Sequence, residues 1–191
     1  MIDKIIKDID ISLENGAYLG ALALALTLPD ICGNAAYPSP NITVGERYKK
    51  WYNDHVDALL KPFSPIAEDM PYLNADIVYS LRCNFLHQGT PNIGASKVTE
   101  DRCKVDKFIL VIEDEDEVDQ SLSHIAYGKD FEIVNRELTV DIRTLCYCLK
   151  TAASNYYEAN KSLFNFFNYS LVDEREERKQ LREIQEKWGL K

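Results

Sequence analysis

The strongest constraint on this fold is the spacing of apolar residues, which recur every three or four positions along most of the chain. Four segments carry this helical period, namely residues 2–28, 44–60, 74–88 and 140–160. The first opens with apolar residues at helical steps (Ile2, Ile5, Ile6, Ile9 and Leu13). An alanine-rich stretch follows, and we predict one long helix that Pro29 and Gly33 end. Residues 33–42 contain Gly, Asn, Pro and Ser and are predicted to form a loop.

The second and third segments carry local signals for helix ends. Thr43 precedes the second segment, and Glu46 three residues later completes a capping box. Asn74 suits the N-cap of the third segment, and Gly89 suits the left-handed position just past its end. We therefore expect both helices to begin or end close to these residues.

The period of the pattern changes in the middle of the chain. Residues 108–112 are rich in β-forming side chains. Two further short runs, 125–127 and 131–134, are separated by Gly-Lys-Asp at 128–130, which predicts a hairpin. We take residues 104–136 as a small β insertion between helices.

One charged segment lies within this insertion, and another follows later in the chain. Five consecutive acidic residues occupy 113–117, and because like charges repel we expect a solvated loop at 113–119 rather than a divalent-ion site. Residues 173–188 are predicted to form a charged helix with few apolar residues (Leu181, Ile184 and Trp188). This helix is expected to pack at one edge or to take part in an oligomer contact.

Length and composition predict one domain. The chain has 191 residues, of which 46% are hydrophobic and 28% charged, which suits a single globular domain over residues 1–191. We therefore predict a mainly α fold, a bundle of about five helices that carries the small β insertion.

Net charge and cysteine content indicate which partners and which cellular compartment suit the protein. The net charge of −9 argues against broad, sequence-indifferent nucleic-acid binding, but it leaves room for a small basic pocket. Five cysteines, an odd number without a C-x-x-C pair, favour a reduced, cytoplasmic setting and no metal site. The apolar run at 17–28 is too short to cross a bilayer, so we expect a buried helix and no membrane contact.

The residues most informative about function are Arg82 and His87, late in the third helical segment. Arginine is a permanent cation that can hold a phosphate through paired hydrogen bonds, and histidine transfers protons near neutral pH. RNA supplies its own nucleophile, the ribose 2′-hydroxyl, so the pair suits phosphodiester cleavage without a metal. Asn84 could orient one of the two side chains or bind a phosphate.

Helix geometry does not bring these two side chains together by itself. Five residues rotate a helix by about 500°, which leaves the side chains roughly 140° apart and about 7.5 Å along the axis. Convergence requires the reach of arginine, a loosened helix end or a second copy of the helix in a two-fold dimer. The ordinary alternative is that His87 caps the helix end while Arg82 makes a surface salt bridge.

The run at residues 79–89, Tyr-Ser-Leu-Arg-Cys-Asn-Phe-Leu-His-Gln-Gly, resembles the signature helix of the HEPN superfamily (higher eukaryotes and prokaryotes nucleotide-binding domains). The hallmark is an arginine, four to six residues, then a histidine, late in a core helix of an all-α bundle. Arg82 and His87 match these two residues. Cys83 stands where the family often has a polar residue, Asn84 follows one position later, and the β insertion lies outside the minimal bundle.

This resemblance implies a metal-independent, cofactor-free endoribonuclease that leaves a 2′,3′-cyclic phosphate and a 5′-hydroxyl. It also implies a homodimer through the motif helix, and a setting in a toxin–antitoxin or phage-defence system with an antitoxin partner. A non-catalytic HEPN-like module that binds a nucleotide or a protein is the main alternative. A purely structural helical protein with a surface arginine and histidine is the third.

A basic cluster in the second helical segment is a weaker candidate for RNA binding. Arg47, Lys49 and Lys50 could line a groove in which Tyr48 and Trp51 stack on bases. Aromatic residues in such a segment are more often core or interface residues, however. The same segment places His55 beside Asp54, where an ordinary surface or core histidine is the favoured interpretation, and His124 suggests nothing specific.

Overall fold

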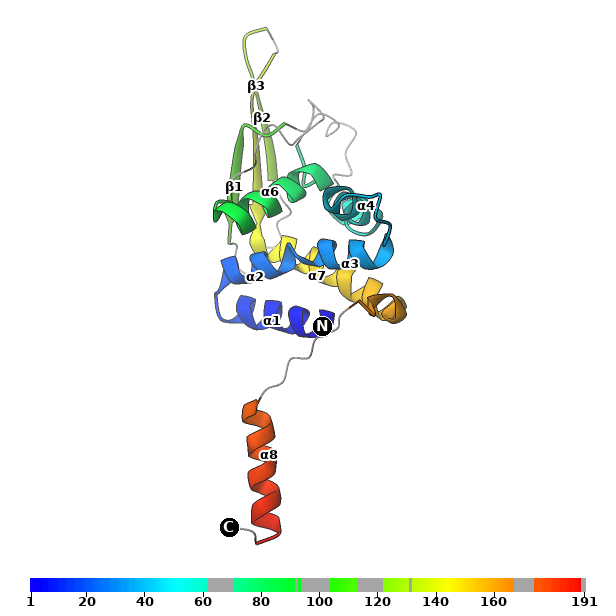
Figure 1. The fold of residues 1–191 in the computed structure, drawn as a ribbon. Coiled ribbons are helices and arrows are strands. Elements are labelled where there is room, and N and C mark those ends of the chain that lie inside the picture. The colour runs from blue at the N-terminus through cyan, green and yellow to red at the C-terminus, as the bar shows by residue number, and fades with distance from the viewer. Residues whose placement is uncertain are drawn as a thin grey trace.

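The structure is a computed structural model that describes residues 1–61, 71–91, 93, 104–112, 122–130, 132–166 and 174–189. It is mainly helical with a small three-stranded sheet (Figure 1), which confirms the predicted class at that level. The helices are α1 (Ile2–Glu14), α2 (Tyr18–Ala25), α3 (Leu28–Ala36), α4 (Val44–His55), α5 (Asp57–Leu60), α6 (Ala75–Gln88), α7 (Ile142–Ala159) and α8 (Glu174–Lys187), with a 3₁₀ turn η4 (Lys161–Phe164). The strands are β1 (Lys107–Val111), β2 (Leu122–Tyr127) and β3 (Ile133–Asp141).

The prediction of one helix over residues 2–28 is wrong, because the chain turns back after Glu14. Gly16 has a φ of 72°, a left-handed conformation that cannot continue a right-handed helix. The side-chain amide of Asn15 donates to the carbonyl of Ile11 at 2.7 Å and covers the end of α1. Helices α1 and α2 therefore form a helical hairpin (Figure 1).

Pro29 begins a helix instead of ending one. It lies in the first turn of α3, where the N–H that proline lacks has no partner inside the helix. Gly33 lies inside α3 and faces α4, and a Cβ there would stand 2.8 Å from the carbonyl oxygen of Arg47. The predicted loop at 33–42 thus starts only after Ala36.

The stretch Tyr18–Ala36 is the one candidate membrane span among the described residues, with a mean hydropathy of 1.4 and half of its length buried. Core helices of folded proteins have the same length and composition. Helices α2 and α3 contact α7, and α3 also contacts α4, so we assign the stretch to the core.

The capping box that starts α4 is confirmed. The N–H of Glu46 donates to Thr43 Oγ1 at 3.3 Å, and the N–H of Thr43 donates to Glu46 Oε2 at 2.7 Å. The helix is shorter than predicted, because Val56 leaves helical geometry with a φ of −120° before the short α5 begins.

Both predicted ends of α6 are confirmed. Asn74 Oδ1 accepts from the N–H of Ile77 at 2.9 Å. Gly89 follows the last turn with a φ of 68°, and its N–H donates to the carbonyl of Phe85 at 3.0 Å. The motif helix is therefore defined at each end by its own local residues.

The sheet has the strand order β1-β3-β2. Strands β2 and β3 pair antiparallel, as the predicted hairpin requires, whereas β1 pairs with β3 in parallel. The predicted insertion at 104–136 is too short, because β3 continues to Asp141. Leu138 and Val140 are fully buried, so the alternating strand pattern extends further than expected. The predicted acidic loop at 113–119 lies outside the described residues.

Helix α7 is the central helix of the body and contacts α1, α2 and α3. Asp141 ends β3 and also caps α7, since its Oδ2 accepts from the N–H of Thr144 at 2.7 Å. Two polar contacts join α7 to the first hairpin, from Lys150 to Asp10 and from Arg143 to Tyr18.

Helix α8 differs from the rest because none of its residues is buried. It stands apart from the helical body (Figure 1). The prediction that it packs at an edge of the body is therefore wrong, while an oligomer contact stays a prediction.

Candidate active site

The side chains of Arg82 and His87 meet within one copy of the chain. Arg82 Nη1 lies 2.9 Å from His87 Nε2. A guanidinium can only donate, so Nε2 accepts, and the neutral imidazole carries its proton on Nδ1. The reach of arginine therefore closes the separation of about 140° that ideal helix geometry imposes on this spacing.

Asp30 in the first turn of α3 holds the other side of the Arg82 guanidinium. Arg82 Nε and Nη2 each donate to Asp30 Oδ2 at 2.8 Å. With these two nitrogens bound to Asp30, Nη1 is the nitrogen that faces His87. The site is therefore a row of three side chains, Asp30, Arg82 and His87, from two helices.

Burial shapes the charges of this row. The side chains of Asp30 and Arg82 are each 18% exposed. Burial raises the pKa of Asp30, although the positive charge of Arg82 opposes the shift. Burial also works to lower the pKa of Arg82, but the charge and hydrogen bonds of Asp30 outweigh it and the pKa is raised. Arg82 therefore stays a cation, while His87 at the end of the row is exposed.

The buried side of the row contains polar atoms without partners among the described residues. These are Asp30 Oδ1 and the hydroxyl of Tyr48. Tyr48 is fully buried and its ring packs on that of Tyr79, with centroids 5.2 Å apart. Burial raises the pKa of Tyr48 well above its ordinary value, so Tyr48 is a neutral wall of the site.

The two predicted supporting residues lie on different sides of α6. Asn84 is only 8% exposed and belongs to the core side of the helix. Cys83 is half-buried and neighbours Tyr79 and Arg82. Cys83 is therefore a direct neighbour of the charged row.

The basic residues of α4 are all engaged by neighbours. Arg47 Nη1 donates to Asn34 Oδ1 at 3.2 Å, and its charge acts on Asp30. Lys49 pairs with Asp76 at 3.1 Å, and Lys50 pairs with Asp54 at 3.5 Å. Of the three, Arg47 is the one that the structure places next to the charged row.

Tyr48 and Trp51 are core residues, as the favoured interpretation of this segment expected, and are not exposed platforms for RNA bases, because both side chains are fully buried. The helical period of α4 points them into the core together with Tyr52. No base can reach these rings without unfolding the helix.

His55 lies at the opposite end of α4 from Arg47. Its ring packs on Trp51 with centroids 5.0 Å apart and on Tyr156 with centroids 4.9 Å apart. Partial burial lowers the pKa of His55, and the charge of Asp54 only partly offsets this. Asp54 itself accepts a hydrogen bond from the hydroxyl of Tyr37.

The sequence contains no pattern that predicts Asp30 as a site residue, because an acidic residue is common in the first turn of a helix. Among the described residues, no group of three or more histidine, cysteine, aspartate or glutamate side chains is placed to hold a metal ion. The described cysteines, Cys32, Cys83, Cys146 and Cys148, are free thiols.

No protein-family model, no curated protein and no solved structure matches this chain. The resemblance to HEPN proteins therefore depends on the motif in α6 and on the geometry of its residues.

Proposed function

We propose that this chain is a metal-independent endoribonuclease of the HEPN type, in which Arg82 and His87 act on one phosphodiester. The observation that carries the proposal is the 2.9 Å contact between Arg82 Nη1 and His87 Nε2. The end of α6 does not need this contact, because Gly89 already closes the helix through Phe85. The contact supports the proposal because it joins a cation and an imidazole, the two groups that the proposed reaction requires, and the imidazole is exposed.

In this mechanism the 2′-oxygen of the substrate attacks the adjacent phosphorus. The imidazole of His87 takes the 2′-hydroxyl proton through Nε2 as the new P–O2′ bond forms. The P–O5′ bond breaks, and the 5′-oxygen receives a proton from the imidazolium or from its equivalent in a second copy. The products are a 2′,3′-cyclic phosphate and a 5′-hydroxyl.

Arg82 stabilises the negative charge that develops on the non-bridging phosphate oxygens. Asp30 binds Arg82 Nε and Nη2 on one side of the guanidinium, so the Nη1 side is the one that faces the substrate in this proposal. A phosphate oxygen that replaces His87 Nε2 as the acceptor of Nη1 frees the lone pair that His87 needs as a base.

The assembly and setting belong to the same proposal and are supported by the motif. The chain would form an HEPN-type bundle and a homodimer through α6, which places two Arg82/His87 pairs around one cleft. The substrate is RNA, the setting is a cytoplasmic toxin or phage-defence system, and an antitoxin is the expected protein partner.

One observation favours the alternative, a non-catalytic module that binds a nucleotide or a protein. Asp30 offsets much of the charge of Arg82, and the whole chain carries a net charge of −9. A site of this kind would bind a ligand without cleaving it.

Cleavage of a mixed RNA pool in EDTA tests the proposal. We expect the wild type to produce fragments with cyclic-phosphate ends, and we expect His87→Ala and Arg82→Ala to lose this activity. His124→Ala is the matched control, because His124 is an exposed histidine on β2, outside the site.

Loss of cleavage in His87→Ala, with His124→Ala fully active, would support the proposal. Equal cleavage by all variants would remove this motif from the mechanism. A folded, dimeric wild type that binds RNA but does not cleave it would favour the binding module.

A further inference from the structure

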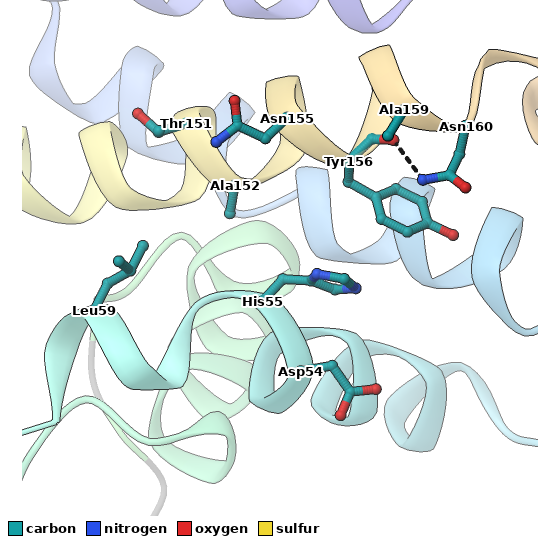
Figure 2. A pocket seen from close by; sticks show the side chains of 9 residues that line it. All are labelled: Asp54, His55, Leu59, Thr151, Ala152, Asn155, Tyr156, Ala159 and Asn160. Carbon is teal, nitrogen blue, oxygen red and sulfur yellow. Dashed lines mark hydrogen bonds between the residues drawn. The ribbon is translucent and has the colours of Figure 1, made fainter.

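A second site candidate lies in the groove where α7 faces α4 and α5. Figure 2 shows His55 and Leu59 on one side of this groove, with Ala152 and Tyr156 of α7 on the other. The groove encloses about 460 Å³, which is within the usual range of roughly 300–1,000 Å³ for small-molecule pockets. It is separate from the row formed by Asp30, Arg82 and His87.

The lining of this groove is mostly uncharged and includes two rings, with the carboxylate of Asp54 at one end. The rings of His55 and Tyr156 lie 4.9 Å apart at an angle of 59°, and Trp51 packs on His55 from the protein side. Partial burial keeps His55 neutral by lowering its pKa. Such walls suit a flat ring, which gains stacking and apolar contact there.

The rim adds hydrogen-bonding groups that both donate and accept. Asn160 Nδ2 donates to the carbonyl of Tyr156 at 2.9 Å, which leaves its amide oxygen for a ligand. Within the described part of the chain, Thr151 and Asn155 have no side-chain hydrogen-bond partner. Asp54 is the charged side chain of the lining, and its carboxylate disfavours an anionic ring, so an uncharged ring with mixed donors and acceptors suits the groove.

A second hollow of about 550 Å³ adjoins the groove at Asp54 and is lined by Lys49 and Lys50. Lys50 is half exposed, and its 3.5 Å pair with Asp54 is long. Exposed pairs of this kind contribute little to stability, so Lys50 is available to an anion. The two hollows together suit a ligand with a flat polar ring joined to an anionic group.

We propose that the groove beside His55 is a nucleobase subsite, with the attached phosphate directed toward Lys50. That the bound nucleotide belongs to an RNA substrate rests on the proposed function. That the groove binds a base does not depend on the proposed function.

The place of this subsite in the fold separates it from the cleaved bond. Gly45 near the start of α4 lies against Tyr79 of α6, whereas the hydroxyl of Tyr52 further along α4 donates to the carbonyl of Leu73, which precedes α6. Helices α4 and α6 therefore run antiparallel. His55 is ten residues along α4 from Gly45, about 15 Å, whereas Arg82 lies one turn beyond Tyr79. The groove would therefore hold a different nucleotide of the strand from the one at Arg82.

Tryptophan fluorescence tests the proposal directly. The chain has two tryptophans, so Trp188→Phe leaves Trp51, which packs on His55, as the single reporter. The four ribonucleoside 5′-monophosphates are each titrated into the full chain that carries this substitution. We expect at least one of them to cause a saturable change in Trp51 fluorescence. Ribose 5-phosphate, which lacks a base, is expected to give none.

Two variants and one matched control locate the binding. Asn155 is exposed, so Asn155→Ala leaves the fold intact, and we expect it to weaken binding about fivefold through one lost hydrogen bond. Lys50→Ala is expected to weaken binding of the monophosphate and not of the corresponding nucleoside. Tyr147→Leu, on the same helix but 61% exposed and outside the groove, is expected to bind as the parent does.

The absence of a saturable change with all four nucleotides would overturn the proposal, as would binding that Asn155→Ala and Lys50→Ala both leave unaltered. Binding without RNA cleavage would keep the subsite and argue against the nuclease. RNA cleavage that depends on Arg82 and His87, without mononucleotide binding, would support the nuclease and argue against the subsite.

Discussion

Asp30 and Arg82 are 52 residues apart in the sequence, and their ion pair determines which nitrogen of the guanidinium faces His87. Arg82 and His87 could be predicted as a pair because they belong to one short contiguous motif. Asp30 could not, because its role depends on the packing of α3 beside α6 and leaves no local pattern. The sequence thus predicted two residues of the candidate site and missed Asp30, the residue that binds one of them.

We predict that Asp30→Asn impairs both activity and stability. The substitution keeps the size of the side chain but removes the charge that binds Arg82 Nε and Nη2. We expect RNA cleavage to fall at least tenfold, and the free energy of unfolding to fall by about 1–3 kcal/mol, because charge-assisted hydrogen bonds are lost in a mostly buried place. Cleavage assays in EDTA and urea denaturation measure the two effects.

Glu137→Gln is the matched control for this change. It removes the carboxylate of a strand-to-strand pair with Lys107, whose side chain is 59% exposed. We expect a loss below about 1 kcal/mol and no change in cleavage. An Asp30→Asn protein as active as the wild type would show that Arg82 is oriented without Asp30.

The helices and strands were predictable where their ends are encoded locally. The start of α4 and the two ends of α6 depend on residues within three positions of each end, namely Thr43 with Glu46, Asn74, and Gly89. Apolar periodicity, in contrast, cannot reveal a single residue that leaves helical geometry, such as Gly16. Pro29 was misassigned because proline occurs both after a helix and in the first turn of the next one.

The close contact between α3 and α4 predicts that Gly33→Ala destabilises the protein. In Gly33→Ala the new Cβ would stand 2.8 Å from the backbone carbonyl of Arg47, so the helices must separate. We expect a loss of about 1–3 kcal/mol in the free energy of unfolding. Cleavage should fall as well, because Asp30 lies on the same helix as Gly33.

Gly20→Ala is the control, because a Cβ at this helical position meets nothing within 4 Å. We expect a gain of about 0.5–1 kcal/mol from the better helix propensity of alanine. Urea denaturation of both variants measures the difference. A Gly33→Ala protein at least as stable as Gly20→Ala would contradict the close approach of α3 and α4.

At the scale of the whole molecule, the count of helical and alternating segments was enough to predict a mainly α fold with a small sheet. The parallel pairing of β1 with β3 was not predictable, because it joins strands that are not adjacent in the sequence. The single domain over residues 1–191 and the HEPN-type arrangement remain predictions. Both concern how the segments assemble in three dimensions, and the apolar periodicity of the sequence carries no information about that assembly.

We predict that removal of residues 174–191 leaves the stability of the helical body unchanged. No residue of α8 is buried, so its loss exposes no apolar surface of the body. We expect the midpoint of thermal unfolding to shift by less than about 2 °C, measured by circular dichroism. A larger decrease would mean that α8 contacts the body or a second copy, and light scattering at the same concentration would separate these two cases.

The central position of α7 has a consequence for synthesis of the protein. Helices α1, α2 and α3 leave the ribosome first, but their shared partner α7 ends only at Ala159. Until then α3 lacks one of the surfaces against which it packs. Under the proposed function, a nascent chain should therefore not cleave RNA until α7 has left the ribosome.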